Sequence, residues 1–249
     1  MAFTVVTAAE RPELIEAMID LGASPWPEFL NHDAVCNAHW RFLYELAADY
    51  QFGLLDDRGE LAAMGNCIPI RWDGNPGTLP DRGIDAVLED GVECLREGES
   101  ATAASALMIV VRPERLGSGI SAKAIKAMAE VVARQGLPDL VAPVRPTWKD
   151  RYPLTAIDRY IEWRRDDGAR FDPWIRAHER AGGEVIGPAS AAMRVTASVA
   201  EWEEWTGMAF PQTGAYVVPG ALVPVEIDRE RDEGDYVEPA CWVRHRTGP

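Results

Sequence analysis

The sequence is poor in cysteine, and its cysteines do not cluster. Cys36, Cys67, Cys94 and Cys241 are far apart in apolar stretches. They have neither the paired spacing of a zinc site nor the density of a secreted disulfide scaffold. We therefore expect four buried thiols and no metal.

Basic side chains are also scarce. The chain has 25 Lys and Arg against 40 Asp and Glu, a net charge of −15. A nucleic-acid partner and an anionic membrane surface are therefore excluded, and an amine or a neutral substrate is more easily attracted. No apolar run reaches the length of a membrane span, and the N-terminus lacks a basic region followed by an apolar core. A cytoplasmic location is expected.

The most informative segment spans residues 109–121. A β-branched run ends at Pro113, Gly117 and Gly119 form a turn, and a helix rich in Ala, Ile and Lys follows. Glycines let backbone N–H groups point outward, and a helix N-terminus adds unpaired donors and a positive dipole end. The segment thus suits a pyrophosphate, although a Gly-x-Gly between strand and helix can also be only a tight connection.

Neither dinucleotide fingerprint fits this loop, because Ala122 stands at the third glycine of G-x-G-x-x-G and the ending of a P-loop is missing. The loop instead resembles the coenzyme A loop of GNAT acyltransferases, since it keeps Pro113 and both central glycines. Leu116 replaces the usual Arg or Gln, for which Arg115 could supply the charge. The resemblance implies a pantetheine and pyrophosphate site made of Ile109, Val110, Val111, Arg115, Leu116, Gly117, Ser118, Gly119, Ile120 and Ser121.

A second resemblance lies in residues 171–186. Asp172 is a natural N-cap and Pro173 suits the first helical position, so a helix is expected that ends at a glycine pair. GNAT enzymes carry a tyrosine there that often protonates the thiolate of coenzyme A, and His178 occupies its position. Imidazole titrates near pH 6.5 and can move a proton at neutral pH. The alternative is a structural histidine with a buried hydrogen bond.

Periodicity predicts the remaining elements. Helices are expected at residues 9–21, 34–48, 85–95, 120–135 and 200–207. Strands are expected at residues 3–7, 106–112, 139–145, 184–186, 191–197, 216–228 and 236–245, with a hairpin over 52–70 and a charged loop at 229–235. The run from 106 to 145 is a βαβ crossover, so a site should open at the carboxyl ends of its strands. Thr147 and Lys149 should leave the second strand close to the thioester.

The resemblance implies an α/β (α+β) fold, with a mixed, strongly twisted GNAT-like sheet flanked by helices. The helix at 85–95 would be an insertion. We expect a single domain over residues 1–249, with a core at about 3–196 and a C-terminal β extension at about 197–249.

The expected function is transfer of an acyl group from acyl-coenzyme A to the amine of a small molecule, and acetyl is the acyl group we expect first. His178 would protonate the leaving sulfur, and Asp73, Glu60 and Glu238 are candidate bases. Similarity to GNAT-like decarboxylases, which pair a histidine with a threonine near the strand exit, adds Thr147 as a catalytic residue. It leaves decarboxylation of a malonyl-type thioester open. A non-catalytic thioester-binding module, an acyl carrier protein as partner and a homodimer are also open.

Overall fold

The structure is a computed structural model that describes residues 3–23 and 26–248. In this part of the chain, one mixed sheet has the order β1-β2-β3-β4-β5-β9-β8-β7, and β6 pairs with β9 outside this path. Neighbouring strands are antiparallel except β4 and β5. The strands are β1 (Thr4–Thr7), β2 (Phe52–Leu55), β3 (Leu61–Ile70), β4 (Ala103–Val111), β5 (Asp139–Val144), β6 (Glu184–Ala197), β7 (Gly214–Tyr216), β8 (Val225–Asp228) and β9 (Glu233–Arg246).

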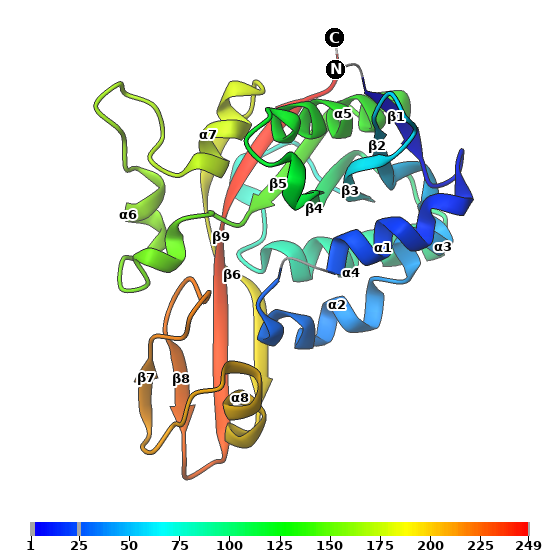
Figure 1. Cartoon of the computed structure of the whole chain (residues 1–249). Helices are drawn as coiled ribbons and strands as arrows, with labels where there is room; N and C mark the ends of the chain where they lie inside the picture. The colour runs from blue at the N-terminus through cyan, green and yellow to red at the C-terminus, as the bar shows by residue number, and fades with distance from the viewer. Residues whose placement is uncertain (1–2, 24–25, 249) are drawn as a thin grey trace.

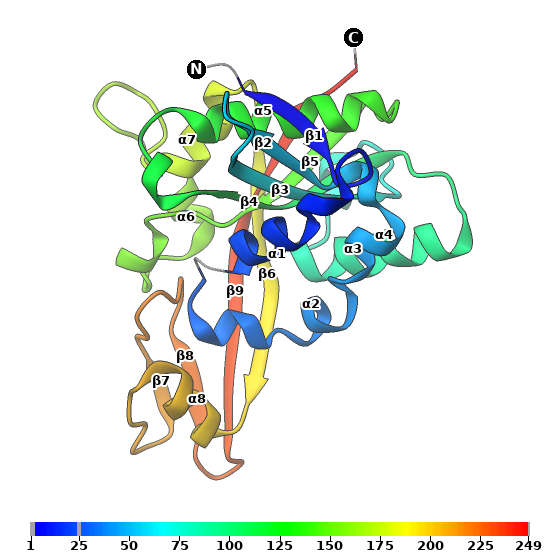
Figure 2. The same cartoon turned by 45° about the vertical axis from the view of Figure 1, so that its right-hand side comes forward.

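Helices cover both faces of the sheet (Figures 1 and 2). They are α1 (Ile15–Ala23), α2 (Ala34–His39), α3 (Phe42–Leu46), α4 (Gly83–Glu97), α5 (Ile120–Arg134), α6 (Ile157–Ile161), α7 (Pro173–Arg180) and α8 (Val199–Thr206). The apolar residues of α5, α6 and α7 share one buried cluster, and those of α1 to α4 fill two clusters on the opposite face. None of the helices in the described ranges is long and apolar enough to cross a membrane.

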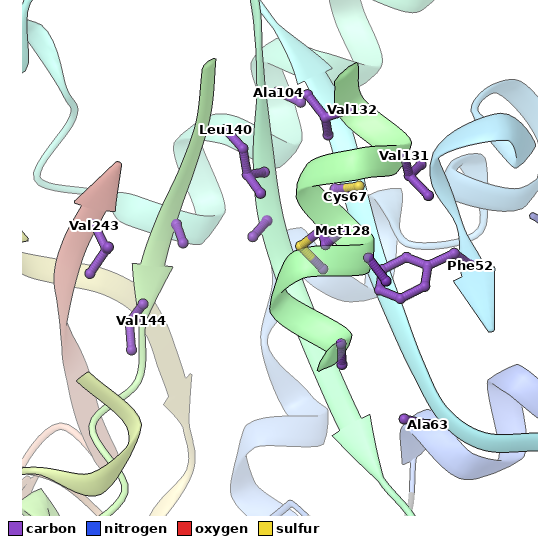
Figure 3. Packing of buried hydrophobic residues seen from close by; sticks show 14 of the residues in the cluster. Phe52, Ala63, Cys67, Ala104, Met128, Val131, Val132, Leu140, Val144 and Val243 are labelled. Carbon is purple, nitrogen blue, oxygen red and sulfur yellow. The ribbon is translucent and has the colours of Figure 1, made fainter. Parts of the chain in front are cut away.

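The largest cluster lies between α5 and the sheet (Figure 3). Met128, Val131 and Val132 of α5 are at most 1% exposed, as is Phe52 of β2. Gly65 of β3 is needed for this packing, because a Cβ there would lie 2.5 Å from Cε1 of Phe52. The close approach fixes α5, and with it the loop that precedes the helix.

A long ladder of β6 and β9 connects this body to a smaller unit (Figure 1). In that unit α8, β7 and β8 pack around Phe29, Trp202 and Tyr236, each at most 2% exposed. Ser198 and Glu201 form a capping box at the start of α8. The final strands therefore belong to the same sheet as the rest of the chain.

The mixed α/β class is confirmed, but the predictions for four segments were wrong. The single strand expected at 216–228 is two short strands, β7 and β8, with turn and loop at residues 217–224. The helix expected at 34–48 is two short helices, because α2 packs against α4 and α3 also packs against β3. The strands expected at 184–186 and 191–197 are one strand, β6, which stays paired to β9 through two register shifts. The charged run 229–235 is a turn only as far as residue 232, since Glu233 already begins β9.

Candidate active site

The site begins where β4 and β5 separate. Only Ala104 with Leu140 and Ser105 with Val141 are paired across these parallel strands. From Ala106 onward, the described part of β4 has a strand partner on its β3 side alone. Its other edge is left with backbone donors and acceptors that can pair with an extended ligand.

A bulge in β4 accompanies this separation. Asn66 of β3 is opposite Met108, whereas the next residue, Cys67, is opposite Ala106, so Leu107 is an extra residue in β4. Bulges bend a strand and increase its local twist. Asn66 is fully buried at this point and donates to the hydroxyl of Tyr44, at 3.1 Å, and to Oε1 of Gln51, at 2.9 Å.

A cavity of about 850 Å³ opens between the separated strands. Its walls come from residues 106–111 of β4, residues 142–144 of β5 with Arg145 after them, and from α1, α2 and α7. Of the predicted site residues, the lining includes Ile109, Val110, Val111, Leu116, Ser121, Thr147 and His178. The site expected at the carboxyl ends of the crossover strands is therefore a real cavity.

The loop before α5 has the predicted geometry. Gly117 has φ +75° and Gly119 has φ +81°, which other residues adopt only with strain. Gly119 is the N-cap of α5 and offers no side-chain cap, so the first N–H groups of a 15-residue helix remain for an anion. The other residues of the predicted pyrophosphate set, Arg115, Gly117, Ser118, Gly119 and Ile120, are not in the lining of the cavity.

Arg115 anchors this loop to the hairpin of β2 and β3. Its Nη2 donates to Oδ2 of Asp56 at 2.6 Å, and Asp56 is 5% exposed. Hydrogen bonds from the backbone of Glu60 and Arg58 lower the pKa of Asp56, and the charge of Arg115 contributes to the same shift. Ile120 is buried in the core beneath the loop.

His178 faces a second histidine. Its Nδ1 lies 2.9 Å from Nε2 of His245, and both rings are 4% exposed. Burial, and secondarily the proximity of His245, lowers the pKa of His178 to about 3, while burial lowers that of His245 to about 4. The expectation that His178 titrates near neutral pH is therefore wrong. The ring is neutral at pH 7 and shares one proton with His245, which leaves Nε2 for a ligand.

Asp172 positions the helix that carries His178. As the N-cap of α7, its carboxylate accepts from the N–H groups of Trp174 and Ile175. Its other oxygen accepts from the N–H of Trp148 at 2.8 Å and from the hydroxyl of Tyr160 at 2.9 Å. One buried carboxylate thus joins α7, α6 and the segment that carries Thr147.

Lys149 does not reach the cavity. Its side chain is fully buried, and Nζ donates to the carbonyls of Tyr152, at 2.9 Å, and Leu222, at 2.6 Å. Burial lowers its pKa to about 8. The expectation that Lys149 approaches the thioester is therefore wrong. Its amine instead connects the loop after β5 to the smaller unit.

Of the three candidate bases, Glu238 alone lines the cavity; Glu60 and Asp73 are exposed elsewhere. Glu238 is 3% exposed and accepts from Nε of Arg145 and from the hydroxyl of Tyr236, both at 2.8 Å. Nη2 of Arg145 donates to the carbonyl of Gly220 at 2.6 Å. The cavity therefore contains a buried ion pair that spans β9 and the end of β5.

The chain is 30% identical to avaD, an arginine N-acetyltransferase from Aspergillus versicolor. The match covers 98% of this chain and 93% of that protein. The chain belongs to the GNAT superfamily. It is an acyl-coenzyme A-dependent N-acyltransferase.

Two solved structures share this GNAT fold over nearly the whole chain. The loading GNATL domain of CurA from Lyngbya majuscula has a TM-score of 0.65 and 16% identity, and covers 99% of this chain and 98% of its own. The GphF GNAT-like decarboxylase in complex with isobutyryl-CoA has a TM-score of 0.56 and 17% identity. This match covers 98% of this chain and 99% of that chain. No family model matches the sequence.

Several groups of this GNAT cavity were not predicted. Trp40, which follows α2, and Tyr44 of α3 line it, but His39 and Phe42 do not. Unpredicted lining residues include Trp26, Asn31, Asn37 and Met193, and His245 is paired with His178. No local motif marks these residues, because they come from segments that only the folded chain brings together.

Proposed function

We propose that this enzyme acetylates arginine or an arginine-like small molecule. The observation that carries the proposal is a single cavity that joins the free edge of β4, His178 and the buried ion pair of Arg145 with Glu238. The likeness to an arginine N-acetyltransferase over nearly the whole chain supports this choice of acceptor.

The acyl donor extends along the free edge of β4 in this proposal. The backbone of Ile109 to Val111 pairs with the pantetheine arm and orients the thioester carbonyl. The N-terminus of α5, with Gly117 to Ser121, holds the pyrophosphate through N–H groups and the helix dipole. The exposed side chain of Leu116 supplies apolar contact instead of charge.

His178 relays the proton. The neutral acceptor amine attacks the thioester carbon, and the new C–N bond leaves that nitrogen positively charged with a lowered pKa. Nε2 of His178 takes the proton and delivers it to sulfur as the C–S bond breaks, which yields the amide and free coenzyme A. His245 orients the ring, and the hydroxyl of Thr147 donates to the oxyanion or positions the acceptor.

Glu238 and Arg145 recognise the acceptor. A guanidinium or ammonium group is attracted to Glu238, which keeps acceptor capacity beyond its two hydrogen bonds. The α-carboxylate of an amino acid is attracted to Arg145. We assign Glu238 to binding instead of base catalysis, because Arg145 and Tyr236 already direct hydrogen bonds to its two oxygens.

The test is acetyl transfer from acetyl-coenzyme A, measured as free thiol and as the acetylated product by mass spectrometry. L-arginine should be a better acceptor than agmatine, which lacks the carboxylate, or ornithine, which lacks the guanidinium. His178→Ala should lower kcat about 100-fold or more. The matched control is His32→Ala, because His32 is not in the lining of the cavity.

Failure of every amine with acetyl-coenzyme A, together with release of carbon dioxide from malonyl-coenzyme A, would replace transfer by decarboxylation. If the His178→Ala variant acetylates arginine at an unchanged rate, His178 is not the proton relay, but arginine remains the acceptor.

A further inference from the structure

Helix α2 packs against α4 (Figure 2), and three potential metal ligands lie close together at this contact. Asp33 is the N-cap of α2, Cys36 lies in its first turn, and Asp85 lies in the first turn of α4. One donor atom from each residue lies within 4.8 Å of the other two. Asp85 lies 49 positions after Cys36 in the sequence, so the fold alone creates the group.

Two carboxylate oxygens in this group have no partner among the described residues. They are Oδ2 of Asp33 and Oδ1 of Asp85. Asp33 is 1% exposed and Asp85 is 3% exposed. Oδ1 of Asp33 accepts from the N–H of Cys36 at 2.7 Å, and a hydrogen bond from the backbone of Arg194 reaches Asp85. Buried carboxylate oxygens are normally paired or coordinate a metal, because desolvation without a partner is costly.

We propose that Asp33, Cys36 and Asp85 bind a divalent transition-metal ion, with Zn²⁺ as the best match. A thiolate with two carboxylates suits zinc, whereas Mg²⁺ and Ca²⁺ select oxygen ligands. Donor atoms around a tetrahedral zinc lie about 3.5 Å apart, so the three side chains would close by roughly an ångström.

The electrostatics of the group favour a cation. Burial, and then the charge of Asp33, raises the pKa of Asp85 to about 8. Burial and both carboxylates raise the pKa of the Cys36 thiol well above its usual value. Arg82 opposes the shift of Asp85, but its guanidinium pairs with Glu89 at 2.9 Å. Binding of the ion releases the protons of Cys36 and Asp85 to solvent, and its charge then stabilises both anions.

The location of this group gives it a link to the cavity. Cys36 is half-buried and lines the cavity, together with Asn37 of the same helix and Ile84, which precedes Asp85. Three protein ligands leave a fourth position of a tetrahedral ion open. The ion would therefore lie at the wall of the cavity formed by α2, away from His178 on α7.

The test uses the full chain and metal alone, and does not depend on any acceptor. Equilibrium dialysis against Zn²⁺ should leave about one ion per chain. Substitution by Co²⁺ should produce a sulfur-to-cobalt charge-transfer band in the near ultraviolet. Cys36→Ser should abolish the band, and Asp85→Asn should weaken binding about tenfold or more. Cys94→Ser is the control, since it removes a buried thiol outside this group.

A wild-type chain that retains no zinc and shows no cobalt band would overturn the proposal. In that case a rise in Tm of Asp85→Asn would indicate that the two carboxylates share a proton. Retention of zinc in both Cys36→Ser and Asp85→Asn would also overturn it, because the ion would then be bound elsewhere. Circular dichroism confirms that each variant is folded.

Discussion

The pair of His178 and His245 shows how burial decides the chemistry of a single residue. The sequence marks His178 through its place on a capped helix, and a free imidazole would titrate near neutral pH. In the fold the ring is 4% exposed and its partner is another imidazole, and burial is the main cause of the lowered pKa of both rings. The charged form is therefore disfavoured, and His178 works from the neutral state.

This pair should make stability depend on pH in acid. The folded-state pKa values, about 3 for His178 and about 4 for His245, lie below the ordinary 6.5. Between these values the unfolded chain binds protons that the folded chain does not, so stability falls as pH decreases from 6.5 towards 4. Urea unfolding across this range should show that the free energy of unfolding decreases. In His245→Gln this decrease should be smaller by about 3 kcal/mol in total. Parallel curves for the two proteins would show that His245 is not buried neutral.

At the scale of elements, β4, its bulge and α7 create the site. The glycine loop and the crossover were predictable, because strand, turn and helix signals are local. The extra residue Leu107 was not, since the register of β4 depends on Asn66 and Cys67 across the sheet. The separation of β4 from β5 depends on how β4 pairs with β3 and with β5, and these strands are far apart in the sequence.

Helix α7 gives the second prediction at this scale. Asp172→Ala removes the acceptor for four donors and should destabilise the protein by about 2–3 kcal/mol. It should also lower kcat, because α7 holds His178. Ser198→Ala is the matched control: it removes the N-cap of α8, which is not in the lining of the cavity, and should cost about 1 kcal/mol with kcat unchanged. Denaturant unfolding and steady-state kinetics of the two variants test this prediction. An equal change of kcat in both variants would contradict a positioning role for Asp172.

At the scale of the whole molecule, β9 joins the parts. It pairs with β5 on one side, and along its length with β6 and β8. It also contributes Glu238 to the cavity and His245 to the histidine pair. The C-terminal segment that carries no motif thus lies at the centre of the sheet and of the site.

This placement predicts how a shortened chain behaves. Residues 1–197 alone would leave β5 without its partner from residue 139 to 144 and β6 without its ladder. Such exposed edges favour aggregation. We expect this fragment to lack cooperative unfolding and to be cleaved rapidly by protease, whereas the full chain resists. A fragment that unfolds cooperatively would show that residues 3–196 are an independent core.

The sequence by itself determined the features that depend on neighbours in the chain. The glycines at positive φ, the capped helix of His178, the βαβ crossover and the family resemblance all arise from local signals. Only the tertiary structure decided the neutral state of His178, the pairing of Arg145 with Glu238, the turning of Lys149 away from the cavity and the meeting of Asp33, Cys36 and Asp85. These depend on burial and on contacts between segments far apart in the chain, for which a single sequence carries no periodic or spacing pattern.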